Sequence, residues 1–316
     1  MTDGGQSARA DETRRPQQPS RHLPLTPRRL EIWTTPGRAG AAAARVLYQP
    51  RNRVRIAAGA VARVLPARSH AVPSPRIQSI VEHVAGQTGI EAIAAAALSV
   101  RETGRWLYAL VRADESGVVV KVGDAGDEGL AREASTLATL SARDTAFGVP
   151  ELRWHGEHDG QLVIVTDIVR RRSAHAEAGI EDALVAACAL ATANGSFVVH
   201  GDLAPWNMVP SATGITLLDW EDSRFEHDPL YDLAHYVTRT GALLHAWRPR
   251  AAVRHLLGRE SVGWRYLSEI GEDPQRAADH VMRYLRHPKT GISSPAQRRY
   301  EAAMTEAIAG WHEGSA

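Results

Sequence analysis

The chain has 316 residues, of which 44% are hydrophobic and 23% charged, and a formal net charge of +1. These proportions are typical of a soluble globular protein, and the near-neutral charge argues against a nucleic-acid binder. The single cysteine, Cys188, excludes a disulfide framework and a multi-cysteine metal site. With a polar N-terminus and no apolar run of roughly 20 residues, the sequence predicts a cytoplasmic protein without a membrane span.

The N-terminal quarter of the chain is predicted to precede the main domain. Residues 1–27 are rich in Gly, Gln, Ser, Pro and Arg, and this composition predicts a disordered tail. Apolar residues return after position 28 and give way to a proline- and serine-rich stretch from Pro66 to Pro75. Residues 28–75 are therefore predicted to form a small extension that ends in a linker, and its protein partner stays unknown.

The segment after the linker predicts a small sheet with helices. Five short, strand-like runs are bounded by turn residues and predict consecutive antiparallel strands. These runs span residues 94–100, 106–112, 117–122, 151–155 and 161–168. Apolar residues at helical spacing predict helices over 77–90, 128–140 and 180–192. The chain is thus expected to be sheet-rich up to about residue 168 and mostly helical after it.

The most informative stretch is a loop followed by a short strand. From Val198 to Asn207 the sequence reads Val-Val-His-Gly-Asp-Leu-Ala-Pro-Trp-Asn, and the next apolar run ends in Asp219. The Asp202 carboxylate is suited to accept a hydroxyl proton, while an amide and a second carboxylate offer the oxygen ligands that magnesium prefers. This is the set of groups that phosphoryl transfer needs. A turn could explain one of these residues, but not three at this spacing.

The pattern resembles the aminoglycoside phosphotransferase and choline kinase family, the small-molecule branch of the protein-kinase-like fold. The resemblance rests on H-x-D-x-x-x-x-N at His200, Asp202 and Asn207, and on the Asp-Trp pair that begins at Asp219. The run Asp-Pro-Leu-Tyr-Asp-Leu-Ala, which contains Asp232, also resembles the stretch that follows the metal-binding strand in that family.

The resemblance implies an α+β, bilobal protein-kinase-like fold with a small antiparallel-sheet N-lobe, residues 76–168, and a mostly helical C-lobe, residues 169–316. It implies a kinase that uses ATP or GTP and Mg²⁺ to phosphorylate a hydroxyl group of a small-molecule acceptor. The sequence has no G-x-G-x-x-G between the first two strands and no Ala-Pro-Glu after Asp219, which argues against a protein kinase. A nucleotide-binding pseudokinase or regulatory module is the alternative.

The family also implies a role for each residue of the motif. Asp202 is expected to be the catalytic base, and Asn207 and Asp219 are expected to hold magnesium on the nucleotide phosphates. His200 is expected to support the loop by packing and hydrogen bonding. Asp232, at the start of a helix, is expected to brace the same loop.

Lys121 is expected to bind the nucleotide phosphates. The chain uses arginine for nearly all its basic residues and has only two lysines, so a lysine in an apolar strand is informative. A solvated edge lysine is the alternative, but a lysine is not interchangeable with the arginines used elsewhere in this chain. Its expected ion-pair partner is Glu133, with Glu128 as the second choice. By family resemblance, backbone groups at about Thr166 to Ile168 would pair with the purine edge.

The acceptor is expected to bind the C-terminal helices, residues 236–311, because specificity in this fold lies largely there. This region is slightly basic, whereas a polycationic aminoglycoside would prefer an acidic pocket. A sugar, a sugar derivative or a partly anionic metabolite therefore stays open beside an aminoglycoside-like acceptor.

Overall fold

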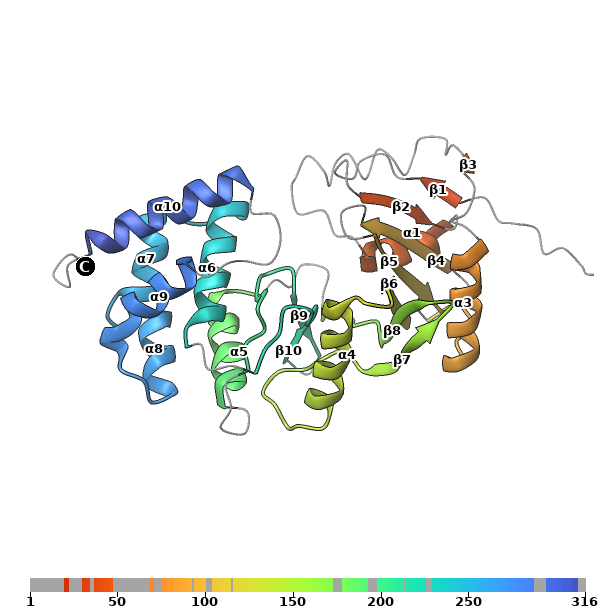
Figure 1. Ribbon diagram of the computed structural model, residues 1–316, viewed down its shortest axis with the longest axis horizontal. Coiled ribbons are helices and arrows are strands. Elements are labelled where there is room, and N and C mark those ends of the chain that lie inside the picture. The colour runs from red at the N-terminus through yellow and green to blue at the C-terminus, as the bar shows by residue number, and fades with distance from the viewer. Residues whose placement is uncertain are drawn as a thin grey trace, which may run out of the picture.

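The structure is a computed structural model with two lobes, a sheet-rich N-lobe and a helical C-lobe (Figure 1). This confirms the predicted α+β, bilobal fold. The structure describes residues 20–22, 30–34, 37–47, 69–70, 75–92, 94–100, 104–114, 116–172, 178–192, 198–212, 214–225, 229–286 and 294–311. No helix among these residues is long and apolar enough to cross a membrane.

The N-lobe sheet has the strand order β3-β1-β2-β4-β5-β6-β8-β7, and every neighbouring pair is antiparallel. The five predicted strands are all present, with bounds close to those expected. They are β4 (Ala94–Val100), β5 (Arg105–Val111), β6 (Gly117–Asp124), β7 (Leu152–His158) and β8 (Gln161–Asp167).

The three remaining strands of this sheet come from the N-terminal segments. They are β1 (Ser20–His22), β2 (Leu30–Thr34) and β3 (Ser69–His70). β2 pairs with β4 from Leu30 opposite Val100 to Thr34 opposite Ala96, so the described part of the extension continues the N-lobe sheet. β1 differs from the disordered tail predicted over residues 1–27, because its backbone pairing with β2 and β3 leaves no trace in composition. The rest of that tail lies outside the described residues.

Helices cover both faces of the sheet, namely α1 (Gly37–Leu47), α3 (Pro75–Thr88) and α4 (Glu128–Ser141). α3 packs on the face formed by Val118, Val120 and Val122 of β6, whereas α4 packs through Leu130 against Ile164 of β8. Successive strand residues point to opposite faces. Lys121 therefore lies on the face opposite the three valines, and that is the face that carries α4.

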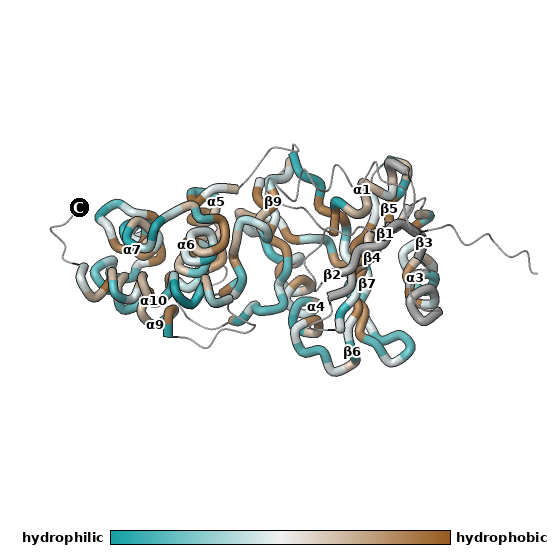
Figure 2. Tube along the Cα trace, turned by 90° about the horizontal axis from the view of Figure 1, so that it is seen from above, coloured by the Kyte–Doolittle hydropathy of each residue, from teal (hydrophilic) through white to brown (hydrophobic). Residues whose placement is uncertain are grey.

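The C-lobe is a bundle of helices around one apolar core. Its helices are α5 (Ile180–Thr192), α6 (Tyr231–Leu244), α7 (Pro249–Leu257), α8 (Val262–Glu269), η2 (Pro274–Arg276), α9 (Ala277–Arg286) and α10 (Pro295–Ala309). In Figure 2, hydrophilic and hydrophobic stretches alternate along the C-lobe helices, as expected for helices that bury one face. The predicted helices over 128–140 and 180–192 are confirmed as α4 and α5, and the one over 77–90 as α3.

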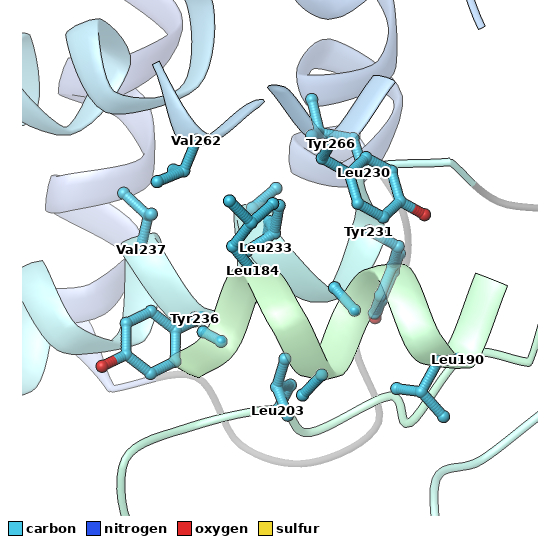
Figure 3. Packing of buried hydrophobic residues seen from close by; sticks show 14 of the residues in the cluster. Leu184, Leu190, Leu203, Leu230, Tyr231, Leu233, Tyr236, Val237, Val262 and Tyr266 are labelled. Atoms are coloured by element: carbon cyan, nitrogen blue, oxygen red, sulfur yellow. The ribbon is translucent and has the colours of Figure 1, made fainter. Parts of the chain in front are cut away.

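The catalytic-loop segment is anchored in this core. Leu203 is fully buried and belongs to the same apolar cluster as Leu184 and Leu190 of α5 and Leu233 of α6 (Figure 3). The loop leads into the hairpin of β9 (Met208–Ser211) and β10 (Gly214–Leu217), which lies between the lobes in Figure 1. The end of β10 then delivers the Asp-Trp pair to the junction of the lobes.

Candidate active site

The backbone of the loop is tightly fixed. Gly201 has a φ of +86°, and a Cβ atom there would lie 2.2 Å from the carbonyl oxygen of Asp222, so only glycine fits. Next to it, the N–H groups of Val199 and Arg224 each donate to the other residue's carbonyl oxygen, at 2.8 and 2.9 Å. The Asp202 side chain is therefore presented from a backbone with little freedom to move.

Two residues that were expected to support the loop make the corresponding contacts. The carboxylate of Asp232, at the start of α6, accepts hydrogen bonds from the backbone N–H groups of His200 at 2.8 Å and Gly201 at 3.0 Å. The His200 ring accepts from the N–H of Asp202 through Nδ1 at 3.3 Å, so its Nε2 donates to the carbonyl oxygen of Leu218 at 2.9 Å. His200 thus ties the loop to the residue that precedes Asp219.

The Asp202 carboxylate is held on both sides. Its Oδ2 accepts from Nδ2 of Asn207 at 2.8 Å, and its Oδ1 lies 2.8 Å from Nε2 of His235 and 3.5 Å from a terminal nitrogen of Arg239. Burial works to raise the pKa of Asp202, but the hydrogen bond with His235 and the nearby charges of His235 and Arg239 outweigh it, so the pKa lies below its usual value. The carboxylate is therefore ionised at neutral pH. We call Asp202, Asn207, His235 and Arg239 the base cluster.

Sequence reasoning missed His235, and it included Arg239 only as part of the broad acceptor region, residues 236–311. A signal was available, because Asp232, His235 and Arg239 follow one another at intervals of three and four residues, which puts them on one face of α6. That pattern alone does not say which loop the face meets.

The predicted ion pair of Lys121 with Glu133 is present. The Nζ atom of Lys121 donates to Oε1 and Oε2 of Glu133 at 2.8 and 2.7 Å, and to Oδ1 of Asp219 at 2.7 Å. Burial acts to lower the pKa of Lys121, but the charges of Asp219 and Glu133 outweigh it and raise this pKa above its usual value. Glu128, the second choice, is exposed in the first turn of α4. Lys121, Glu133 and Asp219 are called the lysine cluster below.

A second charged group, which the sequence did not indicate, lies beside the lysine cluster. Arg105, the first residue of β5, donates to both carboxylate oxygens of Asp127 at 2.6 and 2.7 Å and also pairs with Glu221. Burial and the charge of Asp219 raise the pKa of Glu221 to about 7, against the opposing effects of Arg105 and Lys121. Arg105, Asp127 and Glu221 are called the arginine cluster.

Both clusters span the two lobes through α4. Arg132 of α4 donates to the carbonyl oxygen of Glu221 at 2.6 Å. The buried hydroxyl groups of Thr136 and Ser223 are 2.8 Å apart. The segment after β10 is thus attached to the N-lobe by several polar contacts that surround Asp219.

The residues expected to pair with the purine edge lie at the end of the last N-lobe strand, β8. Thr166 lies inside β8, opposite Val119 of β6 and Leu152 of β7. The backbone N–H of Ile168 donates to the carbonyl oxygen of Gly117 at 3.0 Å, so it is used within the sheet. The strand pairing continues up to this point, and the segment that connects the lobes begins only after Ile168.

The oxygen chemistry near Asp219 fits a magnesium ion. Asn207 uses its Nδ2 group on the carbonyl oxygen and the carboxylate of Asp202, which leaves the amide oxygen as the atom that can bind a cation. The N–H of Leu218 donates to the carbonyl oxygen of Asn207 at 2.8 Å, which places Asp219, the next residue, beside the loop. Asp219 has a φ of +66°, a conformation that Asp tolerates better than most residues.

This two-lobed fold, with an antiparallel sheet in one lobe and helices in the other, is protein-kinase-like. The model of the phosphotransferase enzyme family (APH) matches residues 55–270, and the chain belongs to this family. A search among curated proteins gives no match to the chain.

Several solved structures are similar in fold. A candidate fructosamine-3-kinase from Haemophilus somnus 129PT is 12% identical, with 74% of this chain and 97% of that chain covered and a TM-score of 0.40. An aminoglycoside-3'-phosphotransferase of type VIII is 16% identical over 64% of this chain and 88% of that chain, with a TM-score of 0.34. WbdD, in complex with a kinase inhibitor, is 16% identical with a TM-score of 0.36, and the match covers 62% of this chain and 45% of WbdD.

Proposed function

We propose that this protein transfers the γ-phosphoryl group of ATP to a hydroxyl group of a small molecule. The observation that carries the proposal is that an ionised, fixed Asp202 lies beside the lysine cluster. The two are connected through the hydrogen bonds of Asn207 with Asp202 and with Leu218, the residue before Asp219. One group is suited to take a proton from an acceptor, and the other is suited to hold an anionic donor. Family membership supports the same reaction class.

The lysine cluster would serve the donor. With two carboxylates around it, Lys121 stays charged and is fixed in position to contact nucleotide phosphates. Asp219 and Asn207 would hold magnesium, which would supply positive charge to offset the negative charge of the phosphates. Asp219 would thus serve both the ion pair with Lys121 and the ion.

Asp202 would serve the acceptor. As the acceptor oxygen bonds to phosphorus and the bond from phosphorus to the leaving ADP breaks, the hydroxyl proton passes to the Asp202 carboxylate. The hydrogen bonds from Asn207 and His235 keep this carboxylate in one orientation, so the reaction does not have to order it.

Nucleotide binding and phosphoryl transfer are tested separately. Thermal shifts of the full chain with ATP and GTP, each with and without Mg²⁺, measure donor binding, and ADP release with a library of hydroxyl compounds measures transfer. We expect stabilisation by a nucleotide that depends on Mg²⁺, and ADP release with one acceptor class. No Mg²⁺-dependent stabilisation would contradict the proposal, and binding without transfer to any acceptor would favour the pseudokinase alternative.

A further inference from the structure

The acceptor side of Asp202 carries a positive charge. Oδ2 of Asp202 faces Asn207, toward the residues expected to bind the donor, whereas Oδ1 faces His235 and Arg239 on α6 of the C-lobe. An acceptor hydroxyl has to approach this carboxylate from the side that the donor leaves open. The guanidinium of Arg239 therefore lies next to the position of the acceptor.

The Arg239 side chain is held in place by a buried amide. One terminal nitrogen of Arg239 donates to Oε1 of Gln297 in α10 at 2.8 Å, and Gln297 is 1% exposed. Nε2 of Gln297 in turn donates to Glu301 at 2.9 Å, which fixes the orientation of the amide. Holding a guanidinium in this way reduces the entropy lost when it binds a ligand.

Arg239 retains capacity to bind an anion. A guanidinium has five N–H groups, and the contacts of Arg239 with His235, Gln297 and Asp202 engage at most three of them within the described residues. The Arg239 side chain is 25% exposed and that of Asp202 is 19% exposed, so a small molecule can reach both. Carboxylate and phosphate groups match the planar fork of arginine in shape and charge.

The charge balance changes during the proposed reaction. Before transfer, the negative charge of Asp202 partly offsets that of Arg239, but once Asp202 has accepted the hydroxyl proton this offset is gone. Arg239 would then attract an anionic group on the acceptor most strongly as the proton is transferred, and it would repel a cationic group. The net charge of the C-terminal region, residues 236–311, is also positive, because this region has twelve Lys or Arg residues and seven Asp or Glu residues.

We infer that the acceptor is a hydroxyl compound that also carries a carboxylate or phosphate group, and that Arg239 binds this group beside the reacting hydroxyl. The inference rests on the proposed function and names its substrate class. It sets a polycationic aminoglycoside aside and selects the anionic metabolites among the acceptors that the sequence left open.

The test compares acceptors that share a scaffold and differ in charge. One set is glucose, glucosamine, glucuronate and glucose 6-phosphate, and the other is glycerol, ethanolamine, glycerate and glycerol 3-phosphate. The rate of ADP release by the full-length protein is measured with Mg²⁺ and ATP. With an anionic member of a set, this rate is expected to be at least 10-fold higher than with the neutral and cationic members. The carboxylate and phosphate arms show which anion binds. Equal or better turnover of neutral or cationic members, or no turnover of any anionic member, would overturn the inference.

Variants then test whether Arg239 is the residue responsible. In Arg239→Gln, kcat/KM for the anionic acceptor is expected to fall roughly 10- to 100-fold further than for its neutral counterpart, because a charge-assisted hydrogen-bonded pair is lost. Arg239→Lys should restore part of the preference for the anionic acceptor, because it restores the positive charge. Arg254→Gln on α7 is the control and should leave the wild-type preference unchanged. Equal losses for both acceptors would indicate a purely structural role and contradict the assignment.

The same samples separate this inference from the proposed function. If Mg²⁺ and ATP together do not stabilise the protein, the proposed function fails and the inference fails with it. If they do, and transfer occurs to a neutral or cationic compound, only the inference about the acceptor is wrong.

Discussion

The lysine cluster and the base cluster meet in one site but are built in different ways. In the lysine cluster a cation is surrounded by carboxylates, and one of its two partners comes from the other lobe. In the base cluster a carboxylate is surrounded by an amide, a histidine and an arginine, and all of them belong to the C-lobe. The signs of charge are reversed between the two.

This difference indicates which part of the site is fixed within one lobe and which part depends on the relative position of the two lobes. The base cluster rests on a loop anchored by Leu203 in the C-lobe core and by hydrogen bonds to Asp232. The lysine cluster needs the correct position of the N-lobe relative to Asp219, which the arginine cluster helps to set. Changes at Asp202 or His235 should therefore affect chemistry, whereas changes at Asn207 or in the lysine cluster should affect nucleotide binding as well.

The largest effect is expected for Asp202→Asn, which removes the proton acceptor and keeps the size of the side chain. Turnover should fall roughly 10²- to 10⁴-fold, the usual contribution of a positioned acid or base. The thermal shift produced by ATP and Mg²⁺ should remain, because the lysine cluster is untouched. Turnover at the wild-type level would remove Asp202 from the role of catalytic base.

A smaller loss is expected for Lys121→Arg, which keeps the charge. The planar guanidinium does not fit between Glu133 and Asp219 as the ammonium does, and a misplacement of about 1 Å can cost on the order of 10² in rate. The matched control is Lys289→Arg at the other lysine of the chain. If steady-state rates of both variants equal that of the wild type, Lys121 does not bind the phosphates.

Asp219→Ala tests the metal role. The magnesium-dependent part of the ATP thermal shift should disappear, because an anionic triphosphate needs this counter-charge in the site. Glu181→Ala is the control, since it removes an exposed carboxylate that is ion-paired with Arg265 of α8 and has no expected role in nucleotide binding. A magnesium dependence that survives in Asp219→Ala would exclude this residue as a ligand.

The smallest effect is expected for the arginine cluster. Arg105→Ala leaves the carboxylates of Asp127 and Glu221 without their cation, and the free energy of unfolding should decrease by about 1–3 kcal/mol. Arg153→Ala removes an exposed pair with Asp167 and should cost about 0–1 kcal/mol. Urea denaturation measures both, and equal losses would show that the arginine cluster adds no stability between the lobes.

Much of the site could be predicted because its residues are close in the sequence or follow a simple period. The loop from His200 to Asn207 is one continuous segment, so its spacing already indicates phosphoryl transfer. Lys121 and Glu133 belong to a strand and the next helix, where alternation in one and the helical face in the other orient them toward each other. The purine-edge role of Thr166 to Ile168 stays a prediction, because it rests on family resemblance and not on a local pattern of residues.

The sequence by itself determined the lobes, the strands β4 to β8 and the motif residues, since hydrophobic periodicity and short motifs are local properties. Only the tertiary structure decided that Arg105 meets Glu221, 116 residues away, and that His235 and Arg239 face Asp202. Arginine is common in this chain, so composition gives no reason to select one over another. The packing of α6 against the loop makes that selection, because it depends on the rotation and position of a whole helix.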